Sequence, residues 1–354
     1  MIHKKYILSV FLVLQILFLQ LISQFPNWVE KWYSNGFFSV LSKLERKLFG
    51  WIPFSIGDIL YFFCLLYLFI QLYKIVAEKT VSWRDYILKT INKISVIYFV
   101  FHLMWGLNYY RMPLFEKMEI KKEYSKADLI QFTNRLIEKT NQIQFKITKN
   151  KNQRVASLSE NLTLFTLSQN GYKKLAKTYP DFNYIQPSQK ESLFSKPLTY
   201  MGFSGYLNPF TNEMQVNYMV PKTSKPMVVC HEMAHQIGYA SESECNFIGF
   251  LAAVNNDDLF FQYSAYANAL RYCLALISME DEAQFKLLKT KINTGIVLDF
   301  KENERFWNSY ESIIDKGFYA FYDRFLKINQ QNDGIASYSK FINLMINYYQ
   351  NKNL

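Results

Sequence analysis

The sequence is poor in cysteine, and its few cysteines are irregularly placed. Cys64, Cys230, Cys245 and Cys273 form no CxxC pair and follow no even spacing. They therefore do not predict a disulfide framework. Cys230 directly precedes His231 and so points away from the face of that residue. For Cys230 and Cys245 we predict buried packing.

The chain also lacks a basic helix with base-reading residues, and we predict no nucleic-acid partner. Its net charge is nevertheless +11, and most of the excess positive charge lies in residues 1–114. Basic residues of this kind commonly flank membrane helices. With 354 residues, 50% of them hydrophobic and 18% aromatic, the chain is too apolar for disorder and long enough for two folded units.

Three apolar segments lie in the first third, at about residues 6–22, 54–76 and 94–110. The second is long enough to cross a hydrocarbon core of about 30 Å. No small-residue cleavage site follows the first, so we expect an uncleaved anchor rather than a signal peptide. We predict a membrane domain of three transmembrane helices over residues 1–114 and one globular domain over residues 115–354.

Basic residues predict how these helices are oriented. Lys4 and Lys5 precede the first helix, and Lys79, Arg84 and Lys89 lie between the second and the third. The positive-inside rule places both groups in the cytoplasm. Three crossings that start there put the globular domain outside the cytoplasm.

The most informative motif is His231-Glu232-Met233-Ala234-His235, which contains two of the four histidines in the chain. On a helix, residues four apart share one face, so His231 and His235 can bind one metal ion. Glu232 would lie near the open position of that metal, where it can take a proton from a bound water and pass it to a leaving amine. The motif predicts a catalytic zinc site.

A catalytic zinc site needs a third protein ligand. Gly238 is placed to end the first helix, and Ser241 with Glu244 reads as a capping box that begins a second. Glu242 and Glu244 are alternatives for the third ligand, because residues two apart on a helix diverge. The capping box would occupy Glu244, so we predict Glu242 as the ligand. Asn246, one turn further, would hydrogen-bond a ligand.

Two other segments carry weaker signals. Met214, Val216 and Tyr218 alternate as in a strand, which could pair with an extended peptide substrate or be an ordinary sheet strand. Tyr338 follows a polar loop and could stabilise an oxyanion. A turn between helices, with Ser337 capping the last helix, explains the same residues.

The segment 231–246 carries a resemblance to a known family, together with Gly202, Trp105-Gly-Leu-Asn-Tyr-Tyr-Arg111 and Gly334-Ile-Ala-Ser-Tyr338. The chain resembles bacterial membrane-anchored, zincin-like proteins catalogued as domain of unknown function 3810. The resemblance implies three membrane helices followed by a zincin-like, predominantly helical metallopeptidase domain with a small sheet. The fold class would be mainly α (α+β), in a multi-pass protein of the bacterial inner membrane.

Together these observations predict a membrane-anchored metallopeptidase of gluzincin type. His231, His235 and Glu242 would bind Zn²⁺, and a zinc-activated water would hydrolyse a peptide or protein substrate with Glu232 as base. One alternative is an inactive zinc-binding membrane protein that binds peptides or senses the state of the envelope. Another is an intramembrane protease, but the apolar run 247–254 is too short to span a bilayer.

Overall fold

The computed structural model describes residues 4–77, 82–156, 161–329 and 338–354. Most of them are helical. The elements in chain order are η1 (Lys4–Tyr6), α1 (Ile7–Ile22), α2 (Pro26–Trp28), η2 (Val29–Phe37), α3 (Phe38–Phe49), α4 (Ile56–Ala77), α5 (Trp83–Met104), η3 (Gly106–Tyr110), α6 (Leu114–Lys117), α7 (Lys126–Thr148), α8 (Asn161–Thr178), η4 (Pro180–Phe182), β1 (Gln189–Glu191), α9 (Ser195–Tyr200), β2 (Gly205–Leu207), β3 (Met214–Val216), α10 (Lys225–Gln236), α11 (Glu242–Val254), α12 (Leu259–Glu280), α13 (Glu282–Lys289), α14 (Thr294–Asn308), α15 (Ile313–Ile328) and α16 (Tyr338–Tyr348).

Three helical stretches are long and apolar enough to cross a membrane: Lys4–Ile22, Ile56–Ala77 and Trp83–Met104. The predicted bounds of the third were wrong. It begins eleven residues earlier than expected, because the helix continues through the charged residues Arg84, Lys89 and Lys93. It also ends at Met104, where a short 3₁₀ helix replaces it.

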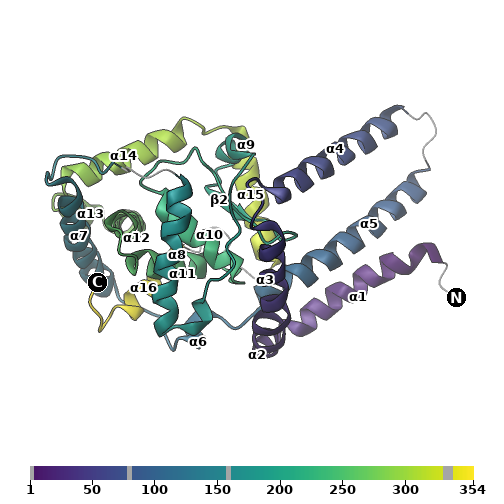
Figure 1. Ribbon diagram of the computed structural model, residues 1–354, viewed down its shortest axis with the longest axis horizontal. Helices are drawn as coiled ribbons and strands as arrows, with labels where there is room; N and C mark the ends of the chain where they lie inside the picture. Colours follow the sequence, from purple (N-terminus) through teal and green to yellow (C-terminus); the bar gives the residue numbers. More distant parts are fainter. Residues whose placement is uncertain (1–3, 78–81, 157–160, 330–337) are drawn as a thin grey trace.

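These three helices project from one side of the molecule (Figure 1). Helices α1 and α5 lie side by side, and the Gln15 amide nitrogen bonds the Ser95 hydroxyl at 3.1 Å between them. Helix α4 meets α5 through Lys93, whose Nζ donates to the Tyr67 hydroxyl over 2.6 Å. Gly57 and Asp58 at the start of α4 are buried, whereas its most apolar part is not. The ends of the three helices at Ile22, Ile56 and Met104 all meet the rest of the molecule.

The segment between the first two apolar helices packs against residues 115–354. Phe38 at the start of α3 is buried, and its ring meets Trp105 edge-on at 5.5 Å. Arg46, further along α3, donates to the Gln236 carbonyl at the end of α10 over 2.9 Å. Phe38 and Trp105 share a small apolar cluster with Ala240, which is distinct from the large cluster that contains α11. The segment before residue 115 is therefore attached to the rest of the molecule through this small cluster and through the Arg46 hydrogen bond.

Helix α11 lies at the centre of the core. Its side chains are buried on all faces, including Phe247, Ile248 and Phe250. Helices α8, α10, α12 and α16 pack around it. At 13 residues it is about 20 Å long by the helical rise. It is a buried core helix, too short to span a bilayer.

The small sheet has the strand order β1-β3-β2, with β1 parallel and β2 antiparallel to β3. The predicted strand is β3, which ends at Val216, so Tyr218 lies outside it. Since β3 is the central strand and both of its edges are paired, the predicted pairing of this strand with a substrate is wrong. The edge strands are β1 and β2, and Gly205 of β2 lies against the side chain of Glu232.

Candidate metal centre

Helix α10 carries the two histidines and ends in a turn that returns the chain toward them. Gly238 has φ +94°, a left-handed conformation that glycine adopts at little cost. The Gly238 amide bonds the His235 carbonyl at 2.9 Å, and the Tyr239 amide bonds the Ala234 carbonyl at 3.2 Å. This pair of bonds is a Schellman motif. The predicted end of the first helix is confirmed, and the chain is free to begin α11 at Glu242.

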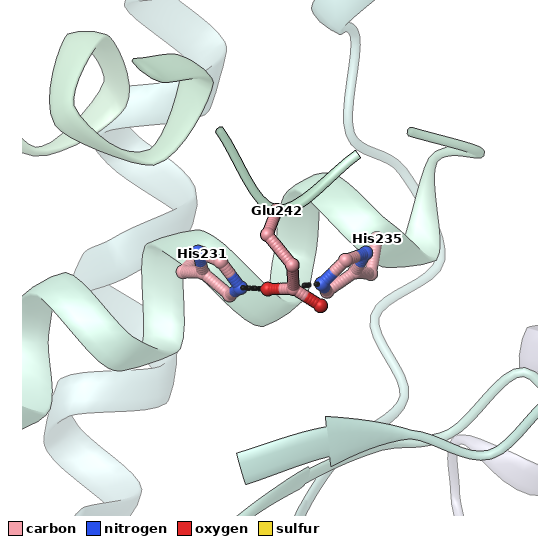
Figure 2. Close-up of side chains that lie close together, drawn as sticks. All are labelled: His231, His235 and Glu242. Atoms are coloured by element: carbon pink, nitrogen blue, oxygen red, sulfur yellow. Dashed lines mark ion pairs between the residues drawn. The ribbon is translucent and has the colours of Figure 1, made fainter. Parts of the chain in front are cut away.

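The carboxylate of Glu242 lies between the two imidazole rings (Figure 2). Its Oε2 is 3.2 Å from His231 Nε2 and 3.7 Å from His235 Nε2. The three potential donor atoms all lie within 4.8 Å of one another. Helices α10 and α11 therefore bring together the three residues that the sequence predicted as ligands.

The remaining ring nitrogens of the histidines are held from behind. His231 Nδ1 lies 3.0 Å from Asn246 Oδ1, and His235 Nδ1 lies 2.8 Å from the Tyr239 carbonyl. A carbonyl oxygen only accepts, so His235 Nδ1 carries a hydrogen and the neutral ring presents a lone pair at Nε2. Cys245 also packs behind His235, with Sγ 3.2 Å from Nδ1. Cys230 and Cys245 are both buried, as predicted.

The donor set fits a zinc ion. Two imidazole nitrogens and one carboxylate oxygen are the ligands of many catalytic zinc sites, which leave a fourth position open. Ligands at about 2.0–2.1 Å in a tetrahedron stand roughly 3.3 Å apart. The 3.2 Å and 3.7 Å separations lie on either side of that value.

Attraction between Glu242 and the two histidines shifts the pKa values in this cluster. Burial raises the pKa of Glu242, but His235 and His231 outweigh it and hold that pKa well below its usual value. Burial lowers the pKa of His235, whereas Cys245 and Glu242 raise it well above its usual value. A cation between the rings would complement the same carboxylate.

Tyr322, on α15, is a site residue that the sequence did not predict. Its hydroxyl donates to Glu242 Oε1 over 2.6 Å, while Oε2 faces the histidines. Tyr322 lies 80 residues beyond Glu242, and no motif links the two. Tyr338, which the sequence suggested instead, begins α16, but its side chain lies outside the described part of the chain.

Glu232 is buried beside the cluster, with only 4% of its surface exposed. Its Oε2 has no hydrogen-bond partner among the described residues. Burial raises the pKa of Glu232, His231 and His235 lower it, and Glu242 adds to the rise, so that the net shift is upward. A raised pKa suits a carboxylate that must both accept and release a proton.

Glu244 lies outside the cluster, and the predicted capping box is absent. Ser241 does precede α11, but its side chain makes no capping bond. Glu244 turns toward the segment before α6, where it accepts the Leu114 amide over 2.6 Å. Burial raises the pKa of Glu244 to about 7. The capping prediction failed because a tertiary backbone donor took the carboxylate.

Arg111 fixes the turn between α10 and α11. Its Nη1 donates to the Gly238 carbonyl over 2.7 Å, and its guanidinium lies 4.0 Å from the centre of the Tyr239 ring. The same side chain donates twice to Glu30, from Nε and Nη2, each over 2.8 Å. Arg111 is thus a positioning residue that ties η2 to the turn behind His235.

The matched family agrees with the resemblance seen in the sequence. Residues 33–346 match the family model described as "Protein of unknown function (DUF3810)". The chain belongs to this family. No curated protein and no solved structure matches it. The match includes α10, α11 and α15 of this DUF3810 protein, and hence the whole cluster.

In this DUF3810 protein the cluster opens into a cavity of about 1290 Å³. His231, Glu232, His235 and Glu242 form part of its wall. Aromatic side chains make up much of the remainder. The cavity is large enough for several residues of a polypeptide, since pockets for drug-sized ligands span roughly 300–1,000 Å³.

Proposed function

We propose that this protein is a membrane-anchored, zinc-dependent metallopeptidase of gluzincin type. The observation that carries the proposal is the convergence of His231 Nε2, His235 Nε2 and Glu242 Oε2 on one point in the wall of a large cavity. The ring hydrogen bonds to Asn246 and Tyr239 support it, because partners behind the ring orient metal-binding histidines.

Metal binding and proton transfer are carried out by different residues of the site. A zinc ion, when bound, would supply Lewis-acid chemistry for the attack of water on a peptide carbonyl. Glu232 accepts the proton of the attacking water and returns it to the leaving amine, so that the C–N bond breaks and a carboxylate and an amine form. Tyr322 keeps Glu242 turned so that Oε2 faces the histidines.

Metal content tests the ligand set. The whole chain should be used in detergent, since Arg46 and Arg111 hydrogen-bond the backbone at the end of α10. We expect about one zinc per wild-type chain, a loss of most of it in Glu242→Gln, and full retention in Glu244→Gln. The two variants make the same chemical change two residues apart. Folded, freshly purified wild-type protein without zinc would overturn the metal site.

Cleavage of a broad peptide library tests the reaction. Glu232→Gln should keep its zinc and its fold but lose about 10²–10⁴-fold in rate, the usual contribution of a positioned general base. Full activity in Glu232→Gln would contradict the role of this residue. If zinc binds and no library peptide is cleaved, the inactive peptide-binding alternative replaces the peptidase.

A further inference from the structure

The cavity reaches from the metal cluster to two of the candidate membrane helices. Tyr61, Cys64 and Leu65 of α4 line it, and so does Phe101 of α5. From Asp58, in the first turn of α4, to Leu65 is about 10 Å along the helix. That is roughly a third of a hydrocarbon core of about 30 Å. A membrane surface at the first turn of α4 would place this end of the cavity at the depth that lipid chains occupy.

The start of α4, which adjoins the cavity, is held by polar contacts, and further along α4 the Tyr67 hydroxyl accepts a hydrogen bond from Lys93 of α5 over 2.6 Å. Asp58 accepts the Ser192 hydroxyl at 3.0 Å and the Leu193 amide at 2.7 Å. Glu213 accepts the Gly57 amide at 2.6 Å. These buried contacts attach the start of α4 to the sheet region, while its apolar stretch has no buried residue among those described.

Helix α15 links the two ends of the cavity. Tyr322 bonds Glu242 at the cluster, and its ring stacks with Phe325 at 6.2 Å between centres. Phe325 in turn meets Phe101 of α5 and Tyr109, each at 6.2 Å. The path from the cluster to the candidate membrane helices is therefore lined by aromatic rings, which an apolar chain can cover favourably.

From this geometry we infer that the substrate is a polypeptide anchored in the same membrane by an apolar transmembrane segment. The segment lies against α4 and α5, and the residues that adjoin it enter the cavity, where the bond near the membrane surface is hydrolysed. The inference rests on the proposed peptidase function and adds the class of its substrate. A soluble peptide would leave the part of the cavity between α4 and α5 unused.

Cys64 allows a direct test, because it lines the cavity and is exposed, whereas the other three cysteines are buried. Full-length protein would be placed in phospholipid nanodiscs with a peptide pool. Each peptide has a randomised segment joined to a Leu/Ala helix of about 20 residues. One cysteine in that helix is activated as a pyridyl disulfide, which exchanges with a thiol without an added oxidant. Its matched control is the same pool without the apolar helix.

A second control moves the reporter by one residue. Phe63 is exposed and does not line the cavity, so the double variant C64S/F63C presents a thiol at the same depth on another side of α4. We expect several-fold more mixed disulfide at Cys64 than at position 63 with the anchored pool. We also expect several-fold faster cleavage of anchored than of unanchored peptides, with product ends close to the anchor.

The outcomes separate this inference from the proposed function. Equal exchange at positions 64 and 63, or equal cleavage of both pools, would overturn the anchored substrate and leave the peptidase standing. Preferential exchange at Cys64 without any cleavage would keep the anchor site and overturn hydrolysis. A third pool carries an acyl chain in place of the helix. Preferential exchange with this acylated pool, and none with the helical pool, would overturn the transmembrane segment as the occupant.

Discussion

At the scale of single residues, the cluster was predictable because its members are neighbours in the chain. His231, Glu232, His235, Glu242 and Asn246 lie within 16 consecutive positions, and helical periodicity relates them. Tyr322 was not predictable, since only the packing of α15 over the cavity brings it to Glu242. The metal-binding residues can therefore be predicted from their local spacing. Tyr322, which orients Glu242, is brought to the site only by the tertiary structure.

Tyr322→Phe should weaken zinc binding about 10- to 100-fold, the usual cost of removing a hydrogen bond to a metal ligand. The ring remains, so its packing on Phe325 is kept. Zinc affinity would be measured by competition with a chelator in detergent. Tyr310→Phe is a suitable control, because Tyr310 packs on Tyr200 and lies outside the cavity wall. Equal affinities in the two variants would show that Tyr322 does not support Glu242.

At the scale of elements, the sequence predicted helices well and their caps less well. Ser125 precedes α7 and forms a capping box with Asp128. Ser241 begins α11 without one, because Glu244 is drawn to the Leu114 amide. The packing of α11 against α10 also depends on Gly249, which belongs to no motif. A Cβ atom at this position would lie 2.9 Å from the His231 backbone nitrogen.

Gly249→Ala should separate α11 from α10 and move Glu242 away from the histidines. Overpacking of this kind costs about 1–3 kcal/mol, against a gain of at most about 1 kcal/mol in helix propensity. Gly317→Ala on α15 is the matched control, since nothing lies within 4 Å of the added atom. We expect a lower thermal midpoint and less bound zinc only in Gly249→Ala. Identical behaviour of the two variants would refute close helix packing as a condition of the site.

At the scale of the whole molecule, the sequence predicted two units, and the structure joins them through buried polar contacts. Glu30 follows the first apolar helix, yet it bonds Arg111 and Lys117, more than 80 residues later. Asp58 reaches Ser192 and Leu193 in the same way. No periodicity reveals such pairs, because each partner is a single polar residue in an otherwise ordinary segment.

Glu30 makes the stability of this junction depend on pH. Burial raises the pKa of Glu30, but Arg111 and Lys117 outweigh it and lower the pKa from 4.5 to about 2. The charged form of Glu30 is thus favoured more in the folded state than in the unfolded state. The contribution of Glu30 to the free energy of unfolding is complete above pH 4.5 and is lost as the pH falls toward 2. The shift corresponds to a contribution on the order of 3 kcal/mol.

The difference in unfolding free energy between wild type and Glu30→Gln measures this contribution. It should be constant above about pH 5 and shrink as the pH falls further. Denaturant titrations of the detergent-solubilised proteins would provide the values. Glu116→Gln, which removes a carboxylate that is half exposed, serves as the control. A difference that does not vary with pH would show that Glu30 is not the group responsible.

The same long-range contacts impose an order on biosynthesis. A ribosome makes Glu30 and Asp58 well before Arg111, Ser192 and Glu213, the residues that satisfy them or hold the adjoining backbone. Glu30 lacks its partner until Arg111 has been translated, and the start of α4 lacks the sheet that fixes it until residue 213 has been translated. The docking of the sheet onto the start of α4 therefore follows the synthesis of all three apolar helices.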